Sequence, residues 1–151
     1  MLGLIQKLGR FLLYGGFGGP KAYETKILEM TVAALSEPDA QSLARQIGLI
    51  ERMQRWNEDR MVIVGFEDKA LLPKLRNESE AHCLAKFRLK GEFGSVTAAV
   101  MTHRGVFSSL EFRPSPTKIK GHDFSVELVA LHASDPGISS GIDAEEHARP
   151  V

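Results

Sequence analysis

Several features that would point directly to a function are scarce in this sequence. Cys83 is the single cysteine among 151 residues, which excludes an internal disulfide and a cysteine-rich zinc site. The 19 Lys and Arg residues balance the 19 Asp and Glu residues, so no overall basic field recruits nucleic acid. A transmembrane helix needs about 20 apolar residues, and Lys7 and Arg10 interrupt the most apolar stretch. What remains is 43% hydrophobic and 25% charged residues, values typical of a soluble globular domain. We therefore expect a soluble protein, and the near absence of cysteine fits a cytoplasmic location.

The two ends of the chain differ in composition from the middle. The apolar spacing in residues 1–14 (MLGLIQKLGRFLLY) predicts a short amphipathic helix, which we expect to dock onto the rest of the protein; membrane contact is the less favoured alternative. Residues 15–20 (GGFGGP) lack the Lys-Ser/Thr of a phosphate-binding loop and are interpreted as a flexible hinge. The acidic residues 133–151 show no periodicity, which is typical of a disordered tail. The expected domain is thus 21–132, after a helix and hinge at 1–20.

Two helices are expected at the start of this domain. Apolar residues from position 21 to position 35 recur with helical spacing. A second helix is expected to begin near Ser36-Glu37-Pro38-Asp39 and to end at about Trp56. Their short connection predicts a helical hairpin, on which Glu51, Arg52 and Arg55 form a solvated face.

Strand patterns follow the helices. Runs of β-branched residues or of alternating polarity predict strands at 60–66, 81–90, 95–103, 106–113 and 123–131, with a loop over 67–80. Short connections between them favour an antiparallel β-meander of four to five strands. Helices followed by strands indicate an α+β fold, with the helices packed on one face of the sheet. The expected core comprises Ile27, Leu43, Ile47, Ile50, Phe87, Leu89, Val100, Leu110, Phe112, Val126 and Leu128.

The residues that commonly carry catalysis do not form a recognisable motif. None of the five histidines stands in a zinc-binding spacing, and adjacent His82 and Cys83 point to opposite faces of one strand, with Cys83 on the apolar face. Ser108 and Ser109 lack a nucleophile elbow, and Lys86 or Arg88 is the expected cross-strand partner of Glu111. We therefore predict no catalytic residue, no bound metal and no cofactor.

A binding surface is the more favoured interpretation. Arg and aromatic residues at element ends and on open sheet faces carry much of the energy of a typical interface. The candidates are Trp56, the basic row Lys86, Arg88 and Lys90 on one strand, and His103 with Arg104 at a hairpin tip. No aromatic residues interleave with the basic row, so a protein partner is expected rather than nucleic acid.

The strand block also resembles a class of proteins. Residues 105–112 (GVFSSLEF), closed by a proline and preceded by a strand that ends in basic residues, are similar to a segment of small bacterial α+β proteins. Some of these act as immunity proteins of polymorphic toxin systems. The resemblance covers roughly residues 40–132 and implies a toxin as the protein partner. The sequence lacks the strongly acidic surface that many nuclease-blocking immunity proteins use.

Two classes of function follow from these observations. The first is a non-catalytic protein-binding module, with an immunity protein that neutralises a cognate toxin as its specific form. The alternative is a small enzyme or ligand-binding domain with a site between the helices and the sheet. A sizeable apolar pocket beside a His or Glu with a perturbed pKa would favour this alternative.

Overall fold

The computed structural model describes residues 19–132. The predicted amphipathic helix, most of the hinge and the predicted tail lie outside these residues. The elements are α2 (Ala22–Ala34), α3 (Asp39–Gly48), β1 (Ile50–Trp56), β2 (Met61–Phe66), η1 (Lys69–Leu71), β3 (His82–Gly91), β4 (Gly94–His103), β5 (Val106–Arg113), η2 (Pro116–Ile119) and β6 (Ser125–Leu131).

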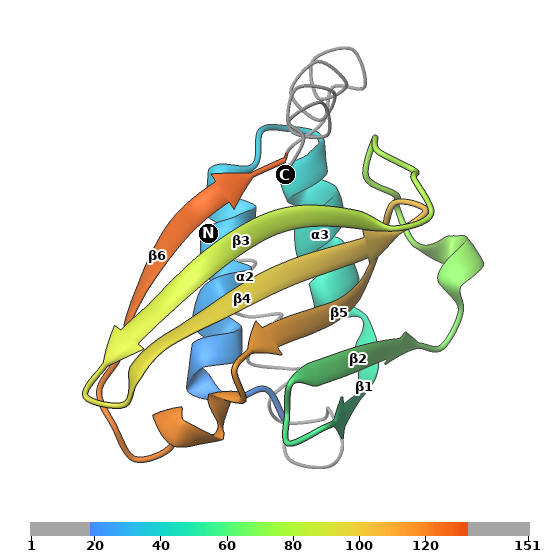
Figure 1. The fold of residues 1–151 in the computed structure, drawn as a ribbon. Helices are drawn as coiled ribbons and strands as arrows, with labels where there is room; N and C mark the ends of the chain where they lie inside the picture. The colour runs from blue at the N-terminus through green and yellow to red at the C-terminus, as the bar shows by residue number, and fades with distance from the viewer. Residues whose placement is uncertain (1–18, 133–151) are drawn as a thin grey trace, which may run out of the picture.

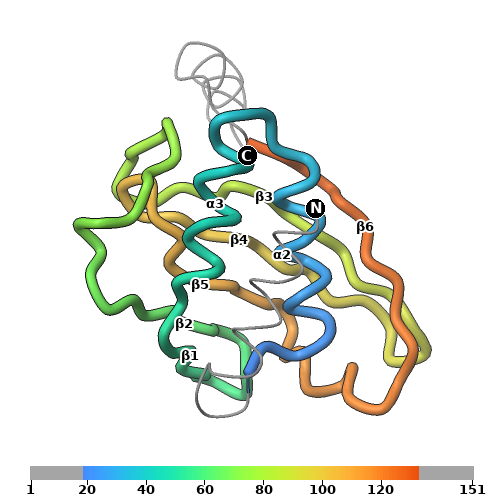
Figure 2. Tube along the Cα trace, turned by 180° about the vertical axis from the view of Figure 1, so that it is seen from behind, coloured from blue at the N-terminus to red at the C-terminus, as the bar shows by residue number. Residues whose placement is uncertain are grey.

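All six strands join in one antiparallel sheet with the order β1-β2-β5-β4-β3-β6. Both helices lie on the same face of this sheet; they are behind it in Figure 1 and in front of it in Figure 2. The α+β class predicted from the sequence is therefore confirmed. The opposite face of the sheet carries no helix within residues 19–132, and we call it the open face.

The main correction concerns the segment expected to complete the second helix. Helix α3 ends at Gly48, and Ile50–Trp56 forms the edge strand β1, so the sheet has six strands rather than four or five. With ten residues instead of about twenty, α3 does not make a clear hairpin with α2. The sequence IERMQRW fits a period of two as well as a helical stripe. Pairing with β2 along its length, from Ile50 opposite Phe66 to Trp56 opposite Met61, stabilises the strand.

The expected meander is present only in part. Strands β3, β4 and β5 follow one another in space, but β5 has β2 as its other neighbour, and β6 lies beside β3. Pro114 and the following 3-10 helix η2 (Pro116–Ile119) end the ladder after β5 and lead the chain away. The chain then returns along the free edge of β3. The first strand of the meander, β3, therefore also pairs with the last strand, β6.

A bulge changes which side chains of β3 face the core. The register shifts between Cys83 and Ala85, so His82 and Leu84 lie on the buried side while Cys83 lies on the open face opposite Met101. The prediction that Cys83 shares the apolar face is therefore wrong, because one extra residue in the strand reverses the alternation before Ala85.

The core lies between the helices and the sheet, as the alternation predicts. Nine of the eleven expected core residues are buried, whereas Val126 and Leu128 on the edge strand β6 are half-buried. Three polar side chains of the helices, Glu24, Thr31 and Gln46, are fully buried, and Gln46 of α3 links the layers. Its Nε2 donates to the carbonyl oxygens of Pro73 (2.6 Å) and Gly105 (2.9 Å), and its Oε1 accepts from the N–H of Phe107 (2.8 Å). Gln46 thereby joins α3 to β5 and to the loop before β3.

Candidate functional site

A row of directly opposed residues crosses the open face. Trp56 of β1 pairs with Met61 of β2, Met61 with Glu111 of β5, Glu111 with Ala99 of β4, and Ala99 with Lys86 of β3. Opposed residues in antiparallel strands point to the same face of the sheet. Trp56 and Lys86 therefore share the open face, four strand spacings or about 19 Å apart.

The centre of this face is apolar. Trp56 is 55% exposed and Ile63 is 39% exposed, so both are among the few large hydrophobic side chains of the described chain that solvent reaches. Ile63 lies opposite Ser109, which in turn lies opposite Met101, next to the row that contains Met61. Trp56, Met61, Ile63 and Met101 thus extend from the edge strand toward the middle of the sheet; we call them the apolar centre.

Basic residues outnumber acidic residues on the rest of the open face. The register places five basic side chains on the open face, Arg52, Lys86, Arg88, Lys90 and Arg113, against two acidic ones, Glu111 and Glu127. Within residues 19–132 none of these seven takes part in an ion pair shorter than 4.0 Å. The expected pairing of Glu111 with Lys86 or Arg88 is not found, because β4 separates their strands. The net positive charge of this face is thus available to a partner.

The hairpin tip lies apart from the row. Arg104 and Gly105 both have positive φ (50° and 80°), as a two-residue type I′ turn requires. The Arg104 N–H donates to the Ser79 carbonyl (2.8 Å), and its guanidinium pairs with Glu80 (3.0 Å). The His103 ring contacts the Glu80 carbonyl. These contacts hold the loop before β3 against the tip, and the part of His103 and Arg104 in partner binding stays a prediction.

The structure brings together some of the predicted residues and adds others. Trp56 and Lys86 occupy one row, Arg88 and Lys90 continue along β3 toward the β3–β4 turn, and His103 with Arg104 lies beyond the other end of that strand. The sequence interpretation missed the half-buried Met61, the exposed Ile63 and the neighbouring Arg113. The alternation of side-chain direction along the strand predicted at 60–66 could have indicated them, because every second side chain of that strand points away from the core.

A buried ion pair fixes the end of β1 that carries Trp56. Arg55 was expected on a solvated face, but its side chain points to the core side and is 16% exposed, because residues 50–56 form a strand. Its Nη2 donates to Glu24 Oε1 (2.5 Å) of α2 and to the Gly19 carbonyl (3.1 Å). Glu24 is fully buried and also accepts from the Lys21 N–H (2.8 Å). Burial raises the pKa of Glu24, and the Lys21 N–H and Arg55 oppose this effect.

The turn after β1 is held in the same way. Asn57, Glu58 and Asp59 all have positive φ (52°, 53° and 64°), a backbone region in which Asn and Asp are the most tolerated residues after glycine. The Asp59 carboxylate pairs with the Lys21 ammonium (2.6 Å), and the Ser115 hydroxyl donates to the Glu58 carbonyl (2.6 Å). Arg55 on one side of Trp56, and Glu58 and Asp59 on the other, are therefore held by other elements, which presents the indole from an ordered position.

Groups suited to catalysis remain scattered in the part of the chain that the structure describes. Between residues 19 and 132 no three His, Cys, Asp or Glu side chains come together as metal ligands would. The Cys83 thiol contacts the Ala85 carbonyl oxygen (3.7 Å). Neither α2 nor α3, the α-helices of this range, has the length and hydrophobicity to cross a membrane.

Comparison of the chain with protein families, with curated proteins and with solved structures finds no match.

Proposed function

We propose that this chain is a non-catalytic protein-binding module that uses the open face of its sheet. The observation that carries the proposal is the row from Trp56 to Lys86 on one uncovered face, which leads from an exposed indole and Met61 past Glu111 and Ala99 to a basic strand. The partner that fits this face is a protein surface with an apolar patch surrounded by carboxylates.

The energetics favour Trp56 as the main contact. Tryptophan and arginine are enriched among the residues whose truncation weakens interfaces most. The Arg55–Glu24 pair and the Asp59–Lys21 pair hold the strand end, so little ordering of the backbone is needed when Trp56 is buried by a partner. Lys86, Arg88 and Lys90 lie farther from the apolar centre, where charges mainly accelerate association with an acidic partner.

The specific form of this proposal is a bacterial immunity protein. It rests on the resemblance of residues 105–112 and their flanking strands to such proteins, and it makes a cognate toxin the first partner to test. An immunity protein of this kind acts in the cytoplasm, where it would cover an acidic surface of the toxin.

The test measures binding of the purified full-length chain to a candidate toxin by titration calorimetry. Trp56→Ala is expected to weaken binding by about 1–3 kcal/mol, or about fivefold to 150-fold, with little change in the melting temperature. Lys86→Ala is expected to slow association and to reduce its dependence on salt. Leu49→Ala is the matched control, because Leu49 is 51% exposed but caps the end of α3 and is not part of the open face.

Two outcomes contradict the proposal in different ways. If Leu49→Ala weakens binding and Trp56→Ala does not, the interface lies elsewhere on the molecule. If the wild-type chain converts a substrate and loses this activity on substitution of one polar residue, the protein is an enzyme.

A further inference from the structure

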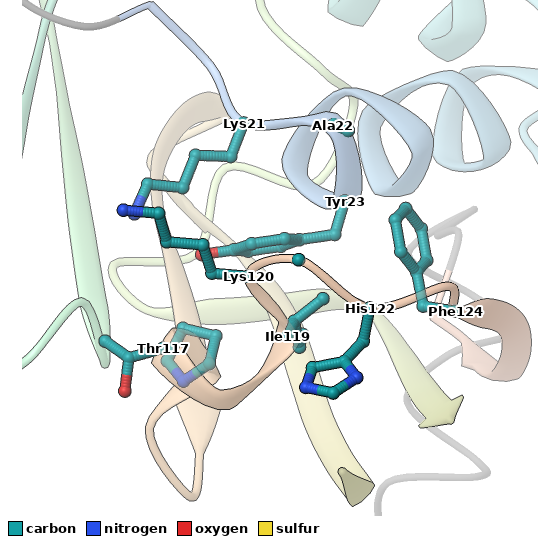
Figure 3. A pocket seen from close by; sticks show the side chains of 10 residues that line it. Lys21, Ala22, Tyr23, Thr117, Ile119, Lys120, His122 and Phe124 are labelled. Carbon is teal, nitrogen blue, oxygen red and sulfur yellow. The ribbon is translucent and has the colours of Figure 1, made fainter. Parts of the chain in front are cut away.

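A pocket of about 600 Å³ lies beside the first turn of α2. Its lining comes from the start of α2, from η2 and from the segment that leads into β6 (Figure 3). The apolar part of the lining is formed by Tyr23, Pro116, Ile119 and Phe124. None of its lining residues belongs to the open face, so this pocket is independent of the proposed protein-binding surface. Its volume is in the range of sites that hold small organic molecules.

Among residues 19–132, the hydroxyl group of Tyr23 has no hydrogen-bond partner. Tyr23 is 5% exposed, and its hydroxyl oxygen is buried. Edge-to-face contacts with Phe112 (5.5 Å between ring centres) and Phe124 (6.5 Å) fix the direction of the ring. Figure 3 shows the hydroxyl directed toward the side of the pocket where the Lys21 and Lys120 side chains end. A buried hydroxyl group normally has a partner, so this one indicates a missing acceptor.

The protonation state of Tyr23 agrees with a donor role. Burial raises the pKa of Tyr23 well above its usual value of about 10, and the nearby Glu24 and Asp59 carboxylates raise it further. The hydroxyl therefore keeps its proton at neutral pH. A ligand atom that meets it has to accept a hydrogen bond.

The charges around the pocket favour an anion. Lys21 and Lys120 line it, and no carboxylate does. The nearby Asp59 is paired with Lys21 (2.6 Å), and Glu24 is paired with Arg55 (2.5 Å). Within residues 19–132, Lys120 takes part in no ion pair shorter than 4.0 Å. The positive charge that remains for a ligand is thus mainly that of Lys120, and the positive end of the α2 dipole adds to it.

We propose that this pocket binds a small organic anion with a ring-sized apolar body. The body lies against Ile119 and Phe124, and the anionic group accepts hydrogen bonds from the Tyr23 hydroxyl and the Lys120 ammonium. Thr117 and His122 also line the pocket, although the Thr117 hydroxyl shares a hydrogen bond with the Ser115 hydroxyl (2.9 Å) and the His122 ring lies 3.9 Å from the Glu92 carboxylate.

The experiment uses two fluorescent probes that share one aromatic body. 8-Anilinonaphthalene-1-sulfonate carries an anionic group, and N-phenyl-1-naphthylamine is the same body without it. We expect the full-length folded chain to bind the sulfonate at least about tenfold more tightly than the neutral amine, as one charge-assisted hydrogen bond to the anion provides. Equal affinities for both probes, or no saturable binding of either, would overturn the proposal.

Three variants locate the binding site. Tyr23→Phe keeps the ring contacts and removes only the unpartnered hydroxyl, so the melting temperature is expected to stay the same or rise while sulfonate affinity falls about tenfold. Lys120→Gln is expected to lower the affinity about threefold to tenfold. Asp59→Asn keeps a residue suited to positive φ and removes the carboxylate beside Lys21, so affinity is expected to rise about twofold to fivefold.

Lys118→Gln is the matched control, because Lys118 is exposed in η2 but does not line the pocket. The pattern that supports the site is a loss in Tyr23→Phe and Lys120→Gln, a gain in Asp59→Asn and no change in the control. The site is refuted if Tyr23→Phe and Lys120→Gln bind the sulfonate like the wild type, or if Lys118→Gln weakens binding as much as Lys120→Gln does.

Discussion

Replacement of Arg55 by methionine tests how the end of β1 is held. The substitution keeps most of the apolar stem and removes the guanidinium, so the fully buried Glu24 retains only the Lys21 N–H as a partner. The other carboxylate oxygen of Glu24 already has no hydrogen-bond partner among residues 19–132. With the two side chains 16% and 0% exposed, solvent screens the pair weakly. Loss of one partner of such a buried pair costs about 3–5 kcal/mol, and we expect Arg55→Met to lower the free energy of unfolding at pH 7 by this amount.

The double variant separates the charge from the packing. Glu24→Gln combined with Arg55→Met leaves no buried charge, so most of the lost stability should return at pH 7. Urea denaturation followed by circular dichroism measures both variants. If the double variant is as unstable as Arg55→Met alone, the loss does not come from an uncompensated carboxylate.

The pH dependence of the same variant gives an independent check. Burial raises the pKa of Glu24, so between its ordinary value and its raised value the folded state binds more protons than the unfolded state. The stability from this group therefore falls as the pH rises through that window. Without Arg55 the window widens, and the deficit of Arg55→Met should shrink from pH 7 to pH 5 by at most about 1.4 kcal/mol per pH unit. A deficit that does not change with pH would refute the reasoning.

Three further predictions concern the core. Gln46→Ala removes the side-chain partner of the Phe107 N–H and of the Pro73 carbonyl and should cost about 2–4 kcal/mol in urea denaturation; a neutral effect would show that the bridge is replaceable. Phe87→Ala should cost about 3–5 kcal/mol by the same measurement, since Phe87 is fully buried, and a loss below 1 kcal/mol would contradict its assignment to the core face. Because burial raises the pKa of Tyr23, the free energy of unfolding should fall as the pH rises above about 10, where tyrosine ionises in the unfolded chain. Tyr23→Phe should flatten this dependence, and an equal decline in both proteins would assign it to other groups.

The strands were predictable from local pattern, and their neighbours were not. Alternation and proline positions located β2 to β6 within one or two residues, because a half-buried strand repeats every two residues. Sheet order depends on which free edges meet after the β3–β5 meander forms. Nothing local in residues 61–63 indicates that they pair with residues 109–111, some fifty positions later. The apolar spacing of residues 50–56 fits both a helix and a strand, and their pairing with β2 is what makes them a strand.

The binding candidates show the same limit. Lys86, Arg88 and Lys90 were predicted to share an outward strand face, and they do. Trp56 was predicted as an aromatic residue at the end of a helix; it lies at the end of β1 instead, and its alignment with Lys86 follows from four successive strand pairings. The pocket left no signal in the sequence, because its lining comes from three separate segments. In the sequence, Tyr23 is simply one of the apolar residues with helical spacing.

The β1–β2 hairpin joins the rest of the sheet through few backbone contacts. β2 and β5 share three residue pairs, whereas β3 and β4 share nine. Cooperative units of a fold open with free energies that reflect such differences, so the hairpin is expected to unfold locally while β3 and β4 stay intact. In native-state hydrogen exchange, the amides of β1 should exchange before those of β4. A partner protein that binds Trp56 would slow this opening. Slower exchange of the β1 amides would then report partner binding without a fluorescent probe.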